Sequence, residues 1–254
     1  MEMGSEIFKA EKILASGEHS DVYGLCSKGR VWVLKCAKNR IDWRGDYKAF
    51  NAFMQYVPKN IYAPQSGGYF ENVEVEYNGQ VYMYQCAVSM NYIDGKKIAK
   101  NFADTDDKNF IKPNYQAMDA LNLVYGLVPA IAHYNQKNYY HMDIIKENLI
   151  IDNKGKVWLI DYTGAKHDKS IFFVLSFKEH YDPKKTPAYH QFLLLGELFQ
   201  DIAEGEQCFN IKNSFLAVQN DYTNNREENI YEFFKNLRSR LFEKGVNWNM
   251  KGYM

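Results

Sequence analysis

Two short apolar runs separated by a turn constrain this chain more than any other part of its sequence. Leu149–Ile151 and Val157–Ile160 flank the segment Asp152–Gly155, whose residues favour turns. The pattern predicts a β-hairpin. Because the two ends of a hairpin lie side by side, Asn148 at its entry is expected to lie beside Asp161 at its exit.

Polar side chains gather at the base of this predicted hairpin. Asp143 lies shortly before Asn148, and Asp161 directly follows the second strand. A carboxylate such as Asp143 can orient an attacking hydroxyl group, while the oxygens of Asn148 and Asp161 are hard ligands that suit Mg²⁺ beside nucleotide phosphates. Asp and Asn also flank strands simply because they favour turns. Their joint spacing favours a phosphoryl-transfer site.

His141, Asp143, Asn148, Asp161 and Gly164 resemble the catalytic loop H-R-D-x-x-x-x-N and the metal loop D-F-G of the protein kinase superfamily. The resemblance covers about residues 7 to 209. It implies an α+β, two-lobed protein-kinase-like fold, with an antiparallel sheet and one helix in the N-lobe and a mainly helical C-lobe. The chain would be a single kinase-like domain, with about 1–92 as the N-lobe and about 93–254 as a C-lobe shortened at its C-terminal end.

The resemblance also implies where a nucleotide would bind. Lys35, in the apolar strand Val31–Ala37, matches the lysine that holds the α and β phosphates, although a lysine at a strand edge can also extend into solvent. Leu14–Tyr23 stands at the place of the Gly-rich loop. Of its three glycines only Gly17 is present. The small residues Ala15 and Ser20 take the other two places, and the nucleotide-binding residues implied here are Ala15, Gly17, Val22 and Lys35.

The segment Val88–Gly95 is similar to the kinase hinge, whose backbone groups bind adenine. By that resemblance Met90 is the gatekeeper, and the Asn91 carbonyl and the amide and carbonyl of Ile93 face the base. A buried strand that ends at a glycine turn has the same composition. The position of the segment relative to the other motifs favours the hinge.

The implied cofactors are ATP and Mg²⁺, and the implied substrate is Ser or Thr of a protein. The resemblance makes Asp143, Lys35 and Lys146 the catalytic residues. It makes Asn148 and Asp161 the metal ligands, with Asn148 also counted as a cofactor-binding residue.

Several positions depart from the kinase pattern. The helix expected at 46–56 lacks the Glu that pairs with the strand lysine, which leaves as candidate partners Asp46, Asn51, Gln55, Glu71 and Glu74. Met142 replaces the Arg that receives an activation-loop phosphate, so activity independent of loop phosphorylation is predicted. Lys146 lies one residue later than the usual lysine, with Ile145 in its place, and Gln191 stands where an Asp is expected.

Two alternative functions are compatible with the same residues. A small-molecule kinase of the aminoglycoside or choline phosphotransferase type shares the H-x-D-x-x-x-x-N loop, as well as an Ile-Asp before an aromatic residue like Ile160–Tyr162. The absence of a clear A-P-E motif and the short C-lobe favour it. A pseudokinase that acts as a binding module is suggested by the missing Glu and the thinned Gly-rich loop. The intact site residues argue against it, and these are Lys35, Asp143, Asn148 and Asp161.

Composition limits the classes of partner that this chain is expected to bind. The chain is 46% hydrophobic, which suffices for a sizeable core, and its 31 basic and 31 acidic residues leave no net charge. Nucleic acid and a membrane surface are therefore not indicated, and a monomer that acts on a protein substrate is expected. The four cysteines form no C-x-x-C pair, and the N-terminal residues resemble no leader, so a cytoplasmic location is expected, with non-classical export into a host left open.

Hydrophobic periodicity places the secondary structure. Strands are predicted near 7–15, 21–26, 31–37, 69–77 and 81–90, with Asn78-Gly79 as the turn between the last two. Helices are predicted near 46–56, 115–136, 188–203 and 227–243, the second of them bent by Pro129. Residues 101–108 are expected to form a polar surface loop.

Overall fold

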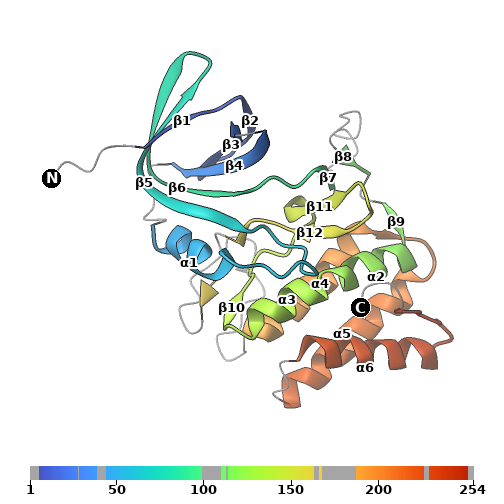
Figure 1. Cartoon of the computed structure of the whole chain (residues 1–254). Helices are drawn as coiled ribbons and strands as arrows, with labels where there is room; N and C mark the ends of the chain where they lie inside the picture. The colour runs from blue at the N-terminus through green and yellow to red at the C-terminus, as the bar shows by residue number, and fades with distance from the viewer. Residues whose placement is uncertain are drawn as a thin grey trace. The chain divides into compact units, whose positions relative to one another are not determined.

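The structure is a computed structural model that describes residues 6–27, 29–38, 44–98, 110–112, 114–162, 166–167, 187–225 and 229–250 (Figure 1). Contacts within the chain divide it into two compact units. The first comprises Met1–Pro58 with Pro64–Ile93, and the second comprises Lys59–Ala63 with Asp94–Met254. The chain combines a multi-stranded sheet with several helices, an α+β content that is compatible with a kinase-like fold. Gly164 and the loop predicted at 101–108 lie outside the described residues.

The first unit is built on a six-stranded sheet with the strand order β1-β5-β6-β4-β3-β2. Neighbouring strands are antiparallel except β1 and β5, which run parallel. The predicted strands near 21–26, 31–37, 69–77 and 81–90 are confirmed. The strands are β1 (Glu6–Lys9), β2 (Lys12–Ser16), β3 (Ser20–Ser27), β4 (Arg30–Ala37), β5 (Ser66–Tyr77) and β6 (Gln80–Asn91).

The single strand predicted at 7–15 is wrong. The chain leaves β1 at Ala10, whose amide donates to the Glu76 carbonyl, and enters β2 after Glu11, whose amide donates to the Gly24 carbonyl. Two residues thus connect the two edge strands of the sheet. They span only about 11 Å, whereas six strands laid flat would separate the edges by about 24 Å. The sheet of this unit must therefore curl strongly, and the periodicity of one strand could not reveal a change of partner.

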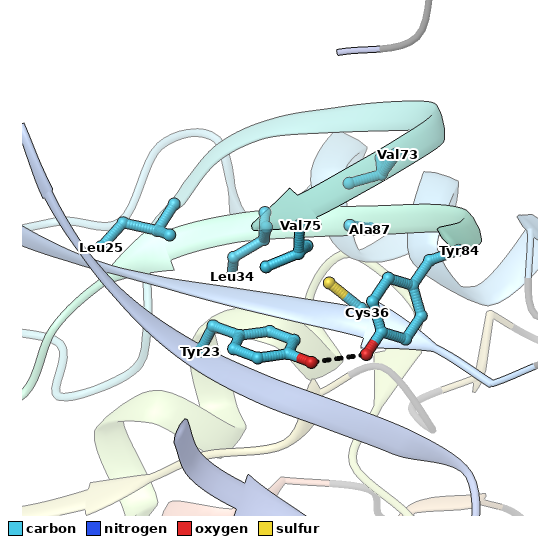
Figure 2. Close-up of a cluster of buried hydrophobic side chains, with 8 residues drawn as sticks. All are labelled: Tyr23, Leu25, Leu34, Cys36, Val73, Val75, Tyr84 and Ala87. Carbon is cyan, nitrogen blue, oxygen red and sulfur yellow. Dashed lines mark hydrogen bonds between the residues drawn. The ribbon is translucent and has the colours of Figure 1, made fainter. Parts of the chain in front are cut away.

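The long hairpin β5–β6 turns at Asn78 and Gly79, as predicted, and both residues have positive φ, at 52° and 75°. One side of the curled sheet forms a core made of residues from the four strands β3, β4, β5 and β6 (Figure 2). In this core the hydroxyls of Tyr23 and Tyr84 lie 2.6 Å apart. The core residues are Tyr23, Leu25, Leu34, Cys36, Val73, Val75, Tyr84 and Ala87.

Helix α1 (Arg44–Met54) packs on β5 and β6. It buries Tyr47, Phe50 and Met54, whose spacing puts them on one face of a helix. The helix predicted at 46–56 is confirmed, with both ends two residues earlier along the chain.

The second unit contains the hairpin that the sequence predicted. Strands β11 (Leu149–Asp152) and β12 (Val157–Leu159) pair antiparallel, and Leu149 lies opposite Leu159. The turn is fixed by the Asp152 carboxylate, which accepts from the amides of Lys154 and Lys156 and from Trp158 Nε1. Burial raises the pKa of Asp152, but these hydrogen bonds outweigh it and leave the pKa below its ordinary value. The sheet is completed by β7 (Gly95–Ile98) and β8 (Phe110–Ile111) in the order β12-β11-β7-β8.

The helix predicted at 115–136 is two helices, α2 (Ala117–Gly126) and α3 (Val128–Asn135), which are separated at Leu127. Pro129 lies in the first turn of α3, where a missing amide hydrogen costs least. The predicted bend is therefore a complete interruption. The helices predicted at 188–203 and 227–243 are confirmed as α4 (Pro187–Ile202) and α6 (Ile230–Glu243). Asn229 caps α6 by accepting from the Tyr231 amide.

Helix α5 (Cys208–Asn225) was not predicted. Its asparagines favour turns over helices, yet Ile211, Phe215, Val218 and Tyr222 recur at helical spacing and are buried. In the core of this unit, Phe192 of α4 stacks on Phe233 of α6 at 4.6 Å. Helices α5 and α6 pack against each other and are neighbours in Figure 1.

The remaining strands are two residues long: β9 (Tyr115–Gln116), β10 (Tyr139–Tyr140), β13 (Lys166–His167) and β14 (Ala203–Glu204). Within the part of the chain that the structure describes, no helix has the length and apolar character needed to cross a membrane.

Candidate active site

His141 connects the loop after β10 to the end of the hairpin. Its buried ring accepts at Nδ1 from the Asp143 amide, at 3.2 Å, and its Nε2 lies 2.9 Å from the Ile160 carbonyl oxygen. Since Nδ1 accepts, Nε2 carries the hydrogen and donates to Ile160. The ring also contacts Tyr162 edge-on, with centroids 4.5 Å apart. His141 therefore fixes the backbone at Asp143 relative to the strand that precedes Asp161.

Asn148 closes the loop that carries Asp143. Its side chain is buried, and Nδ2 donates to the Asp143 carbonyl at 2.9 Å and to the Asp143 Oδ2 at 2.8 Å. Because both bonds use the amide nitrogen, the Asn148 Oδ1 keeps its lone pairs for another partner. Lys146 and Asn148 belong to the short 3₁₀ helix η2 (Lys146–Asn148), in which Lys146 is half-buried.

The hairpin brings Asn148 and Asp161 together in the chain path, as predicted. The Ile160 amide donates to the Asn148 carbonyl at 2.8 Å, so Asp161 is the next residue after a direct backbone contact with Asn148. Asp161 has a φ of 65°, a left-handed conformation that costs about 1 kcal/mol or more for a residue other than glycine. Strain of this kind persists where the surroundings impose it, and it is concentrated at functional sites.

The side chains packed against this loop are aromatic or uncharged. Tyr139 donates its hydroxyl to the Tyr162 carbonyl at 2.7 Å, and Tyr162 is completely buried, which raises the pKa of its phenol well above the ordinary value. Gln191 of α4 is also buried, and its Nε2 donates to the His141 carbonyl at 3.2 Å. The position where the resemblance expects an Asp thus contacts the predicted catalytic loop, through an amide.

In the first unit, strand register places the predicted nucleotide residues on one face of the sheet. Ala15 pairs with Val22, and Val22 pairs with Lys35. Directly paired residues share a face, and alternate residues of a strand point the same way. Met90 is paired with Val33, two residues before Lys35, so it shares that face as well. The opposite face is the core of Figure 2.

The other predicted nucleotide residues lie at the ends of strands. Gly17 follows β2, and its amide donates to the Ser20 carbonyl at 2.9 Å. Asn91 ends β6 and exchanges backbone and side-chain hydrogen bonds with Gln65, while Ile93 is the last residue of the first unit. The Asn91 amide is therefore used within the unit, and the Asn91 carbonyl and Ile93 remain predicted adenine contacts.

Two of the candidate partners of Lys35 are engaged elsewhere. Glu71 forms an ion pair with Lys48 of α1 at 2.8 Å and accepts from the Tyr69 hydroxyl. The interactions with Lys48 and Tyr69 lower the pKa of Glu71. Asn51 accepts a hydrogen bond from Ser66, at 2.8 Å. Glu71 and Asn51, two of the predicted partners of Lys35, thus stabilise the packing of α1 on the sheet.

Sequence reasoning missed one group of polar residues. The Asp21 carboxylate, on the core side of β3, accepts from Lys38, Ser16 and Tyr84. An Asp followed by Val22 and Tyr23 in a strand was a signal, but only the pairing of β3 with β4 shows that Lys38 can reach it.

The described residues contain no group of three or more His, Cys, Asp or Glu side chains that could hold a metal ion. Mg²⁺ commonly takes one or two protein oxygens and completes its shell with phosphates and water. Asn148 and Asp161, as a pair of oxygen ligands, suit such a site.

Comparison with known proteins gives limited support. No family model matches the chain. Mitogen-activated protein kinase kinase kinase 3 of Arabidopsis thaliana is 26% identical over 179 residues, which are 69% of this chain and 27% of that protein. The chain thus spans about a quarter of the length of that relative. This similarity weakly supports a distant relationship to protein kinases, and with it a kinase-type phosphotransferase.

Proposed function

We propose that this chain is an ATP- and Mg²⁺-dependent phosphotransferase that acts on Ser or Thr of a protein. The observation that carries the proposal is the position of Asn148, whose side chain donates to Asp143 and whose carbonyl accepts from Ile160, the residue before the left-handed Asp161. A loop of this kind holds a carboxylate and two oxygen ligands in fixed positions, which is what phosphoryl transfer needs from a protein.

The residues have separate roles in the proposed reaction. Asp143 accepts the proton of the substrate hydroxyl, and Asn148 Oδ1 and Asp161 would hold Mg²⁺, which neutralises the phosphates. Lys35 binds the α and β phosphates, and Lys146 stabilises the transferred group. Ala15, Val22 and Met90 line the sheet face against which adenine would lie.

Activation without loop phosphorylation is part of the proposal. Met142 is only 3% exposed and belongs to the core, so the residue before Asp143 is a packing residue. It offers no cation to a phosphate. We expect phosphatase treatment to leave the turnover unchanged, and a loss of activity after treatment would contradict this part.

The decisive experiment is incubation with γ-labelled ATP and Mg²⁺, with a protein mixture and a metabolite mixture as acceptors. Wild type should label protein, and Asp143→Ala should reduce labelling by about a thousandfold or more, with an unchanged circular dichroism spectrum. Label found only on aminoglycosides or choline would assign the chain to small-molecule kinases. Absence of transfer to either mixture would refute the proposed activity and favour a binding module.

The proposal includes no nucleic-acid partner, for which the balanced charge of 31 basic and 31 acidic residues is the support. It also takes the protein as a cytoplasmic monomer.

A further inference from the structure

Lys38, directly after β4, holds the loop between β2 and β3 at three points. Its Nζ donates to the Gly17 carbonyl at 2.9 Å and to the Ser16 Oγ at 3.0 Å, and its backbone amide donates to the His19 carbonyl at 2.9 Å. We call these contacts, together with the ion pair to Asp21, the Lys38 strap.

Asp21 anchors the strap from the sheet. Its residue is 8% exposed, and its Oδ1 lies 2.7 Å from Lys38 Nζ and 2.6 Å from Ser16 Oγ. Its Oδ2 accepts from the Tyr84 hydroxyl at 2.8 Å, which in turn lies 2.6 Å from the Tyr23 hydroxyl. Burial raises the pKa of Asp21, but the bonds from Lys38, Ser16 and Tyr84 outweigh it and lower the pKa. The carboxylate is therefore ionised at neutral pH, and both of its oxygens accept hydrogen bonds.

The strap acts on the orientation of the loop amides. In a planar trans peptide the carbonyl and the following amide hydrogen point in opposite directions. Since Lys38 Nζ binds the Gly17 carbonyl, the Glu18 amide must point away from that ammonium group. The His19 carbonyl instead accepts from the Lys38 backbone amide as part of the pairing of β3 with β4, so the Ser20 amide points along the sheet. A backbone amide that points outward from a turn can donate to an anion.

The strap lies on the opposite side of the sheet from the proposed nucleotide face. Asp21 pairs with Cys36 on the core side of β3 and β4, whereas Val22 pairs with Lys35 on the other side. Lys38 reaches Asp21, so its ammonium group approaches the loop from the core side.

We propose that Lys38, anchored by Asp21, is a positioning residue that fixes the loop Ser16–Ser20 and turns the Glu18 amide toward the phosphates of a bound nucleotide. This inference rests on the proposed nucleotide-binding function. It also accounts for the loss of two glycines from the loop, since a loop held by side chains needs less backbone freedom.

The test compares ligands with and without phosphates. Calorimetry should show that Lys38→Met weakens the binding of Mg-ADP about tenfold, which corresponds to about 1.4 kcal/mol, and changes the binding of adenosine less than about twofold. Lys38→Arg should recover most of the affinity, because it keeps the cation. Lys9→Met is the matched control, since it breaks an exposed ion pair with Glu76 at the opposite edge of the sheet. It should affect neither ligand.

Hydrogen exchange of the nucleotide-free protein tests the strap separately. Lys38→Met and Asp21→Asn should speed the exchange of amides within residues 16–20, and Lys9→Met should not. Unchanged exchange would overturn the strap, and a parallel loss of ADP and adenosine binding would overturn its action on phosphates. If wild type bound neither ligand, the nucleotide role would fail together with the proposed function, and the exchange experiment would still decide whether Lys38 holds the loop.

Discussion

Replacing Asn148 by Asp tests the geometry of the candidate site without relying on any substrate. The Asn148 Nδ2 lies 2.8 Å from the Asp143 Oδ2, in a residue that is only 8% exposed. In Asn148→Asp an oxygen with negative charge takes the place of that donor. Two hydrogen bonds to Asp143 are lost, and two carboxylates are brought into contact.

The size of this destabilisation follows from the distance between the two carboxylates and from the cost of protonating one of them. At about 3 Å and an effective dielectric constant of 20, two unit charges repel by about 5 kcal/mol. The protein can avoid this by binding a proton, which at pH 7 costs a carboxyl of ordinary pKa about 4 kcal/mol. The free energy of unfolding should therefore fall by about 3–4 kcal/mol at pH 7.

The sign of the pH dependence is also fixed. The introduced carboxyl group has a higher pKa in the folded than in the unfolded state, so the folded state binds more protons as the pH falls. The deficit relative to wild type is complete above the raised pKa, and it shrinks by up to about 1.4 kcal/mol per pH unit toward pH 4.

Urea unfolding at pH 5, 6, 7 and 8 measures the deficit, with Asn153→Asp as the control. Asn153 also donates to a carboxylate, that of Asp94 at 3.0 Å, but both residues are exposed, Asn153 in the hairpin turn and Asp94 directly before β7. The control should cost less than about 1 kcal/mol, and its cost should fall in salt. Equal deficits for the two variants, or a deficit for Asn148→Asp that does not change with pH, would refute the buried contact with Asp143.

Three further changes test other parts of the structure by denaturant unfolding. Tyr84→Phe removes a donor to Asp21 and should cost about 1 kcal/mol near pH 7; because the pKa of Asp21 is lowered in the folded state, the loss should vanish as the pH falls below that pKa. Gly95→Ala should cost about 2 kcal/mol or more, since a Cβ there would lie 2.5 Å from a carbonyl oxygen of β11, whereas Gly45→Ala, with nothing within 4 Å, should be neutral or stabilising. Gln191→Glu removes a buried donor and adds a charge, so a cost of about 3 kcal/mol that shrinks at acid pH is expected, and a neutral effect would contradict the contact with His141.

Local patterns predicted the hairpin and the turn at Asn78-Gly79 because both depend on short-range chemistry. The apolar runs around Asp152–Gly155 and the turn residues between them define β11 and β12, and the register then places Asn148 next to Ile160. The approach of Asn148 to Asp161 was therefore readable from spacing alone. The donor bonds from Asn148 to Asp143 were not, because they depend on how the loop between them folds back.

Other features depend on partners that are distant along the chain. The separation of β1 from β2 follows from their pairing with β5 and β3, at opposite edges of the sheet. The Lys38 strap depends on the register between β3 and β4, which no single segment encodes. Helix α5 illustrates the other limit, since its asparagines oppose a helix and only packing against α4 and α6 supports it.

Three departures from the kinase pattern replace or remove an ionised group. Gln191 replaces an Asp, Met142 replaces an Arg, and α1 has no Glu, so three ionised groups of the pattern become neutral. The Gln191 amide gives a reason for one of them. Its Nε2 donates to the His141 carbonyl, a bond that a carboxylate cannot make because it has no hydrogen to donate. Uncharged donors and packing thus hold the loop at Asp143 in place. The loop between β2 and β3, by contrast, is held by the ion pair of Asp21 and Lys38.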